Sequence, residues 1–200
     1  MQLDKTVIKA HAKLRMSGYD KILLGYRLQN VEKSNEHKYL SQLLQKGNNK
    51  FNLDSSSYEN LTDKEKDLGI NYAFTLGDYV KQNGNELYIN MQLEKVYMND
   101  LIDADREAPK EIEFKTIDRG INTLDIPAGY KVSYLPESVN YIGPLGGFKI
   151  SYTVKGNLLI SESSIDINTL MIYPKDFSEW NKMIRALSRA YNESVTLVKQ

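Results

Sequence analysis

Three acidic side chains at alternating positions are the clearest candidates for metal chemistry in the sequence. They are Asp103, Asp105 and Glu107, and Asn99 and Asp100 lie just before them. Carboxylate and amide oxygens are the ligands that hard cations such as Ca²⁺ prefer. The run lacks the central glycine and the distal glutamate of an EF-hand loop. A solvated acidic loop is the more common origin of such a run, so these residues are weak metal candidates, and the sequence predicts no cofactor.

The sequence offers no recognisable set of catalytic residues. It contains no cysteine, and its two histidines, His11 and His37, lie far apart and are expected at the surface. The missing cysteine removes a thiol nucleophile, disulfides and thiolate metal sites. Neither a Gly-x-Ser-x-Gly elbow, a phosphate loop, a His-Glu-x-x-His pair nor a dinucleotide fingerprint occurs. A glycosidase-like pair of carboxylates needs only proximity in space and stays open. We therefore expect this chain not to be an enzyme.

Aromatic side chains are the main candidates for ligand binding. The chain has 14 tyrosines and one tryptophan, Trp180. Tyr19, Tyr134 and Tyr141 are near expected turns, where they and the tryptophan could stack on a sugar or a peptide. Tyrosines in sheets more often form cross-strand packing pairs. Both interpretations remain open at the level of sequence.

The charge balance argues against two classes of partner. Lysine plus arginine and aspartate plus glutamate both number 26, so no net positive field favours nucleic acid. No apolar run approaches the roughly 18 to 20 residues that span a bilayer. Four basic residues, Lys9, Lys13, Arg15 and Arg27, could form an anion-binding stripe on one sheet face. The zero net charge favours an ordinary solvated face instead.

Alternating apolar residues predict a mostly β fold built from antiparallel strands. Residues 6–29 alternate on both sides of Gly18 and predict a hairpin, and residues 51–53, 70–76 and 87–93 predict further strands. The polar run 54–60 is expected to be a loop or an edge strand. Asn83-Gly84 is a strong hairpin signal. Ser34, Leu40 and Gly47 predict a short helix near residues 35–46.

The second half repeats the pattern of strand, turn and strand. Strands are expected around residues 112–116, 124–126, 130–134, 148–154, 158–160, 165–167 and 195–199. Pro127 and Gly129 predict a turn between two of them. Residues 143–147 are expected to form a flexible glycine-rich loop.

A helix over residues 176–192 is predicted from one apolar stripe, which must cover a sheet face. Asp176 and Glu179 have capping-box spacing at its start. The stripe consists of Phe177, Trp180, Ile184, Leu187 and Tyr191.

These elements predict an antiparallel β-sandwich-like fold with two short helices, the second packed on a sheet. The acidic segment 97–110 is expected to connect a front β region, residues 1–100, to a back region, residues 101–200, although one continuous domain is also possible. The sequence enters strand-like alternation almost at once, so we expect a domain excised from a longer protein.

Several segments resemble a known bacterial domain. The sequence is similar to the C-terminal β-rich domain of unknown function that follows the transglutaminase-like domain in certain cell-envelope proteins. In the front half, the opening strands and residues 84–90 resemble the same family. The segments in the back half that carry the likeness are residues 106–109, 126–136, 173–177 and 195–199.

This resemblance implies a non-catalytic accessory domain. The family's papain-like core uses Cys, His and Asp, and no position here matches that triad. The implied partner is the transglutaminase-like core of the same parent chain, or its substrate, at the periplasm or outer cell surface. The alternative is a free-standing module that binds carbohydrate or peptide. Protein, peptide and glycan ligands therefore all remain expectations.

Overall fold

The computed structural model describes residues 1–200, which form two compact units, Met1–Val80 and Lys81–Gln200. We refer to them as unit 1 and unit 2 and describe each separately. The sequence favoured a division near residue 100, whereas the compact units divide at residues 80 and 81. The physical reason is strand pairing, because residues just after position 80 join a sheet with the last strand of the chain.

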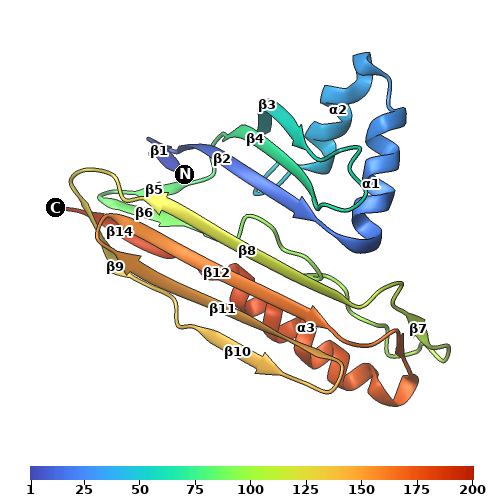
Figure 1. The fold of residues 1–200 in the computed structure, drawn as a ribbon. Helices are drawn as coiled ribbons and strands as arrows, with labels where there is room; N and C mark the ends of the chain where they lie inside the picture. Colours follow the sequence, from blue (N-terminus) through green and yellow to red (C-terminus); the bar gives the residue numbers. More distant parts are fainter. The chain divides into compact units, whose positions relative to one another are not determined.

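Unit 1 is a four-stranded antiparallel sheet with two helices (Figure 1). The strand order is β1-β2-β4-β3, so β3 is an edge strand and β4 lies inside the sheet. The elements are β1 (Gln2–Asp4), β2 (Val7–Met16), α1 (Gly18–Asn30), α2 (Lys33–Leu43), β3 (Phe51–Glu59) and β4 (Leu68–Leu76).

The core of unit 1 follows from alternation along β2 and β4. Side chains at even positions, such as Ile8, Ile70 and Phe74, are buried, while those at odd positions of β2 are exposed. Successive side chains of a strand point to opposite faces, so one face carries the core. Leucines of the two helices are also buried and provide the apolar cover for this face: Leu24, Leu28, Leu40 and Leu44.

The predicted hairpin over residues 6–29 is wrong in its second half. Residues 7–16 form β2 as expected, but Gly18–Asn30 form α1. Leu24 and Leu28 are the buried pair of α1, and they are four residues apart. That spacing fits one face of a helix as well as one face of a strand. The alternation of apolar residues was therefore real, but it did not distinguish the two structures.

The other predictions for unit 1 fit the structure closely. The helix expected near residues 35–46 is α2 over Lys33–Leu43, although its N-cap position is Glu32 and not Ser34. The polar run 54–60 lies mostly in β3, which is an edge strand. Gly47 has φ +73°, and a Cβ there would lie 2.9 Å from Leu76 Cδ1, so both backbone and packing require glycine.

Unit 2 contains two four-stranded antiparallel sheets, a two-stranded ribbon and one long helix (Figure 1). The sheet orders are β10-β11-β12-β8 and β5-β6-β14-β9, and β13 pairs with β7. The first elements are β5 (Lys81–Asn83), β6 (Glu86–Ile89), β7 (Lys110–Glu111), β8 (Thr116–Asp125), β9 (Tyr130–Tyr134) and β10 (Val139–Ile142). The remaining elements are β11 (Gly146–Lys155), β12 (Leu158–Ile167), β13 (Met171–Ile172), a 3₁₀ turn (Pro174–Asp176), α3 (Phe177–Asn192) and β14 (Val195–Lys199).

The mostly β, antiparallel fold class is confirmed, with three α-helices where two were predicted. None of these helices combines the length and apolar character that a membrane span requires. The turn at Gly129 has φ +78°, as its sequence predicts. Its two flanking strands belong to different sheets, so the turn passes the chain between sheets and does not close a hairpin.

Helix α3 provides the centre of the unit 2 core. All five residues of the predicted stripe are buried, and Trp180 and Ile184 are 0% exposed. The expected capping box is not formed, because Asp176 makes no side-chain cap hydrogen bond and is itself the last residue of a 3₁₀ turn. The apolar stripe therefore predicted helix α3 and its buried face correctly, whereas the capping-box spacing did not predict its N-terminal hydrogen bonds.

The irregular segment 90–102 is fastened to α3 by hydrogen bonds. Trp180 Nε1 donates to the carbonyl of Asp100 at 2.6 Å. The amide of Asn181 both donates to and accepts from the backbone of Ile102, at 2.8 Å in each case. The last residues of segment 90–102 belong to the segment 97–110, which was expected to connect the two halves of the chain. Segment 90–102 has little regular structure, but it is an integral part of unit 2.

Buried polar side chains join the same segment to the sheet β10-β11-β12-β8. Gln92 is 2% exposed, and its Nε2 donates to Ser161 Oγ at 2.6 Å and to the Tyr152 hydroxyl at 3.4 Å. Asn122 Nδ2 donates to the carbonyl of Met91 at 3.0 Å. These bonds offset the cost of burying polar groups and fix the position of the segment against β12 and β8.

The expected flexible loop at residues 143–147 is wrong for its last two glycines. Gly146 and Gly147 begin β11. A Cβ on Gly146 would lie 2.2 Å from the carbonyl oxygen of Asp166, and one on Gly147 would lie 2.5 Å from that of Tyr141. These glycines therefore permit close approach of strands and do not provide flexibility.

Candidate functional site

The face of the unit 1 sheet opposite its buried face contains a hollow. We call this surface the open face; it consists of His11, Lys13, Ser55, Ser57, Asn71 and Ala73. Strand register sets two rows across it. His11 pairs with Ala73, which pairs with Ser55, and Lys13 pairs with Asn71, which pairs with Ser57.

A β-bulge places the two serines on this face. Before the bulge, Phe51 and Leu53 pair with core residues of β4. The register shifts between Leu53 and Ser55, so Ser55 and Ser57 pair with residues of the open face. An extra residue in one strand reverses which side chains point to which face. Without the bulge, the odd-numbered serines would point toward the core.

The bulged residue, Asp54, has polar partners of its own. Its carboxylate accepts hydrogen bonds from Asn52 Nδ2 at 2.6 Å and from Thr75 Oγ1 at 2.8 Å. Both partners are side chains of neighbouring strand residues. These bonds hold the bulge in place, and thereby also hold the two serines that follow it.

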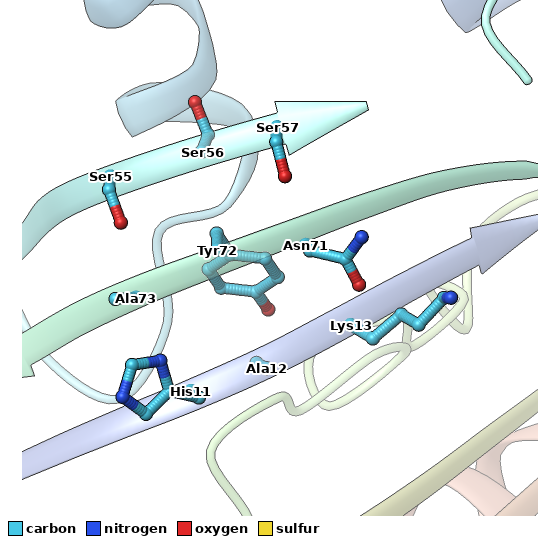
Figure 2. A pocket seen from close by; sticks show the side chains of 9 residues that line it. All are labelled: His11, Ala12, Lys13, Ser55, Ser56, Ser57, Asn71, Tyr72 and Ala73. Atoms are coloured by element: carbon cyan, nitrogen blue, oxygen red, sulfur yellow. The ribbon is translucent and has the colours of Figure 1, made fainter. Parts of the chain in front are cut away.

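The hollow on the open face has a volume of about 560 Å³ and is broadly open to solvent. Figure 2 shows Ser55 and Ser57 directed to one side of β3 and Ser56 to the other. Ala73 and the serines have short side chains, and the longer side chains around them form the walls of the hollow. The lining includes parts of Ala12, Ser56 and Tyr72 in addition to the open-face residues.

A fixed carboxylate borders the hollow. Glu59 accepts hydrogen bonds from Lys13 Nζ at 2.5 Å and from Asn71 Nδ2 at 2.8 Å. These two donors, with the positive charge of Arg15 nearby, hold the pKa of the Glu59 carboxyl below its usual value. Lys13 and Asn71 are thus oriented by Glu59, while Ser55, Ser57 and His11 are exposed to solvent.

The open face has the chemistry of a polar binding surface. Hydroxyl, imidazole, ammonium and amide groups line it, and together they can donate and accept hydrogen bonds. It lacks the apolar enclosure that typical small-molecule sites use. An extended polar ligand, such as a peptide, fits this composition better than a compact apolar one.

The predicted metal candidates do not come together. Asp103, Asp105 and Glu107 are exposed, between residue 102 and strand β7. No group of three His, Cys, Asp or Glu side chains is placed to hold a metal ion.

The predicted aromatic platform is wrong for its tryptophan. Trp180 is 0% exposed, and its ring contacts Tyr97 edge-on, so it cannot stack on a ligand at a rim. Tyr141 stacks on Phe148 with 5.7 Å between ring centroids, which is the cross-strand packing that sequence favoured as the alternative. Tyr19 and Tyr134 remain about half exposed.

The predicted basic stripe is divided between elements. Lys9, Lys13 and Arg15 are on β2, but Arg27 is on α1. Lys9 pairs with Asp4 at 3.5 Å and Lys13 pairs with Glu59. The acidic partners support a solvated face over an anion-binding stripe. His11 is exposed on the open face, and His37 contacts the carbonyl of Leu53 at 3.1 Å.

Sequence reasoning missed the open face. The sequence placed His11 and Lys13 on the polar side of a strand, but it gave no reason to expect Ser55, Ser57 or Asn71 in a functional site. Their assembly depends on the pairing of β2 with β4 and on the bulge in β3. The one available signal was the serine run 55–57, whose small polar side chains leave room on a sheet face.

Comparisons with known proteins place most of unit 2 in a family. No curated protein matches the chain. One solved structure, described as a "putative protease" from Parabacteroides distasonis, is similar at 16% identity and a TM-score of 0.44. The similarity covers 52% of this chain and 20% of that one, so this chain spans a small part of its length.

A family model for a domain of unknown function, DUF3858, matches residues 85–197, which lie within unit 2. The match supports the predicted resemblance to a domain of unknown function over this unit, and it begins after unit 1. Because it covers more than half of the sequence, the chain belongs to the DUF3858 family of domains of unknown function.

Proposed function

We propose that the chain is a non-catalytic accessory region of a larger, transglutaminase-like protein of the bacterial cell envelope. In this proposal the region is located in the periplasm or at the outer surface. It contacts the catalytic core of the parent chain or the substrate of that core. The chain belongs to a family of domains whose function is unknown, and its sequence contains no cysteine. The missing cysteine favours an accessory role over a thiol-dependent catalytic one.

The observation that carries the proposal is the open face of unit 1. Its hollow presents hydrogen-bonding groups from three strands, and Glu59 holds two of them in place. A rigid polar surface of this kind recognises exposed main-chain and polar side-chain groups of another polypeptide. The proposed contact with the core or its substrate is therefore assigned to this face.

The test fills the hollow in the complete gene product. The variant Ser55→Arg/Ser57→Arg places two long side chains on the open face, and Thr153→Arg, on an exposed part of β11, is the matched control. We expect kcat/KM for a peptide substrate to fall about tenfold in the double variant, which corresponds to about 1.4 kcal/mol of lost interaction. The control should keep its activity.

Two results would contradict the proposal. One is full activity of the double variant when circular dichroism shows that it is folded. The other is a complete reading frame that encodes no domain with Cys, His and Asp in transglutaminase order.

The alternative is a free-standing module that binds peptide or carbohydrate. One observation favours the peptide form, since β3 is an edge strand beside the hollow and has no neighbouring strand on one side. An extended peptide can add to such an edge by β-strand pairing. NMR shifts confined to residues 51–59 on peptide titration would support it, and a glycan array would test the carbohydrate form.

A further inference from the structure

Helix α1 has a second apolar surface that does not face the core. Leu24 and Leu28 are buried, yet four other large side chains on this helix of 13 residues are exposed. We call these four the outer stripe: Tyr19 (51% exposed), Ile22 (64%), Leu23 (36%) and Tyr26 (70%). Polar residues are expected on the solvent side of a helix that packs on one sheet.

The outer stripe is continuous along the helix. Its members are separated by three, four and seven positions, which places them on one face. Single exposed apolar residues are common, whereas a contiguous exposed patch marks an interaction surface. The stripe therefore calls for a partner surface that is itself apolar.

We propose that the outer stripe packs against the outer stripe of a second copy of the chain, with the two α1 helices antiparallel. A two-fold axis between Ile22 and Leu23 makes the pattern its own complement. Ile22 then meets the partner's Leu23, and Tyr19 meets the partner's Tyr26. This inference does not depend on the proposed accessory function.

Charge next to the stripe supports a second copy as the occupant. Asp20 is in the first turn and Arg27 in the last turn of α1, and both are exposed. Seven residues correspond to about two helical turns, so the two charges lie on the same flank of the stripe. In an antiparallel pair with two-fold symmetry, like flanks adjoin. Asp20 then lies near the partner's Arg27, and this ion pair occurs twice.

The opposite flank is closed within unit 1. Lys21 Nζ donates to the carbonyl of Lys64 at 2.6 Å, and Gln29 Nε2 donates to that of Leu61 at 3.2 Å. A Cβ on Gly25 would contact the same Leu61 carbonyl at 3.9 Å. The neighbouring loop thus contacts this flank of α1, which is not the flank that carries Asp20 and Arg27.

The single helix limits the strength of the association. A stable interface usually buries about 1,200–2,000 Å² in total, more than four large residues per copy provide. We therefore expect a weak dimer that forms as the concentration rises. A lipid surface is a poorer partner, because such helices carry an excess of basic residues on the polar side, and here Asp20 balances Arg27.

Sedimentation analysis of the full 200-residue chain over a concentration series tests the proposal. We expect a monomer–dimer equilibrium, weakened about tenfold or more by Ile22→Lys, the equivalent of about 1.4 kcal/mol. Ile142→Lys is the matched control, because Ile142 is an isoleucine on β10 of unit 2 that is 85% exposed. The control should dimerise like the wild type.

Charge exchange tests the antiparallel arrangement. Asp20→Arg alone gives two positive charges on the flank, and Arg27→Asp alone gives two negative charges. Each variant should self-associate more weakly than the wild type, because like charges would face each other. A mixture of the two should form mixed dimers, since every facing pair is then of opposite sign.

The outcomes separate the proposal from its competitors. A chain that stays monomeric at all concentrations would overturn it, as would a dimer that Ile22→Lys leaves unchanged. Failure of the two charge variants to form mixed dimers would overturn the antiparallel arrangement. Far-UV circular dichroism of each variant establishes that helix α1 has not been lost.

Discussion

The hydroxyl of Tyr191 is an unusual polar group in the unit 2 core. The residue is 1% exposed, and its hydroxyl has no hydrogen-bond partner. Burial raises the pKa of this phenol, and the nearby carboxylates of Asp118 and Glu94 raise it further. An unpaired buried hydroxyl costs about 1–3 kcal/mol by protein mutational data. The ring of Tyr191 therefore stabilises the core, while its oxygen does not.

We expect Tyr191→Phe to raise the free energy of unfolding by about 1 kcal/mol at neutral pH, because it removes the unpaired group and keeps the ring. The folded pKa lies above the unfolded value of about 10, so unfolding releases a proton at high pH. Tyr191 is neutral in both states below pH of about 10. As the pH rises above this value, wild-type stability should fall more steeply than that of the variant.

Urea unfolding at neutral and at alkaline pH measures both effects. Tyr26→Phe serves as the control, because it removes a tyrosine hydroxyl from a side chain that is 70% exposed. A clear loss of stability in Tyr191→Phe would mean that the hydroxyl has a partner, such as a bound water.

At the level of elements, the β11–β12 hairpin depends on a glycine. Gly146→Ala would place a methyl group 2.2 Å from the carbonyl oxygen of Asp166, so the two strands would have to separate. We expect a loss of about 1–3 kcal/mol or more, as for other overpacked sites. The change in urea midpoint measures it.

Gly120→Ala, on β8 of the same sheet, is the matched control for this prediction. Its Cβ would lie 2.9 Å from Ser163 Oγ, and a hydroxyl can rotate away where a backbone carbonyl cannot. Equal effects of the two substitutions would show that loss of glycine flexibility, and not strand contact, sets the cost.

Elements with one clear period could be predicted, and α1 could not. The α3 stripe repeats only at helical spacing, and Phe148, Ile150 and Tyr152 of β11 alternate along the strand and are buried. In α1 the exposed Ile22 and Tyr26 each come two residues before a buried leucine, Leu24 or Leu28, which creates apparent alternation. The apolar outer stripe thus made a helix look like a strand.

The open face could not be predicted for a different reason. Its residues come from β2, β4 and β3, whose order in the sheet differs from their order in the chain, because β4 lies between β2 and β3. The position of Ser55 also depends on a bulge, and the polar run around Asp54 has no period that would reveal it. Register and bulges are properties of paired strands, so one strand's sequence does not contain them.

At the level of the whole molecule, the part of the chain that can fold by itself should begin near residue 81 and not near residue 101, as the sequence suggested. We expect residues 81–200 to fold alone with Trp180 fluorescence like that of the full chain, because this tryptophan is 0% exposed inside unit 2. Emission spectra and urea unfolding of the fragment measure this. A fragment with solvent-exposed tryptophan emission would contradict it.

The fragment 101–200, which follows the division expected from sequence, is the comparison. It lacks β6 and the carbonyl of Asp100, which accepts the hydrogen bond of Trp180. It also lacks Gln92, the buried partner of Ser161. We expect this fragment to fold poorly, and equal stability of the two fragments would support the division near residue 100.

The place of β14 affects how unit 2 is made on the ribosome. Val195–Lys199 pairs with β6 on one side and β9 on the other, so the interior of that sheet is supplied by the last strand of the unit to be synthesised. After β6 and β9 have left the ribosome, the edge of each strand that will later pair with β14 stays unpaired until β14 is synthesised. Such edges readily pair with other chains. Slow translation of this stretch therefore lengthens the period of aggregation risk, and chaperone dependence should be greatest just before β14 emerges.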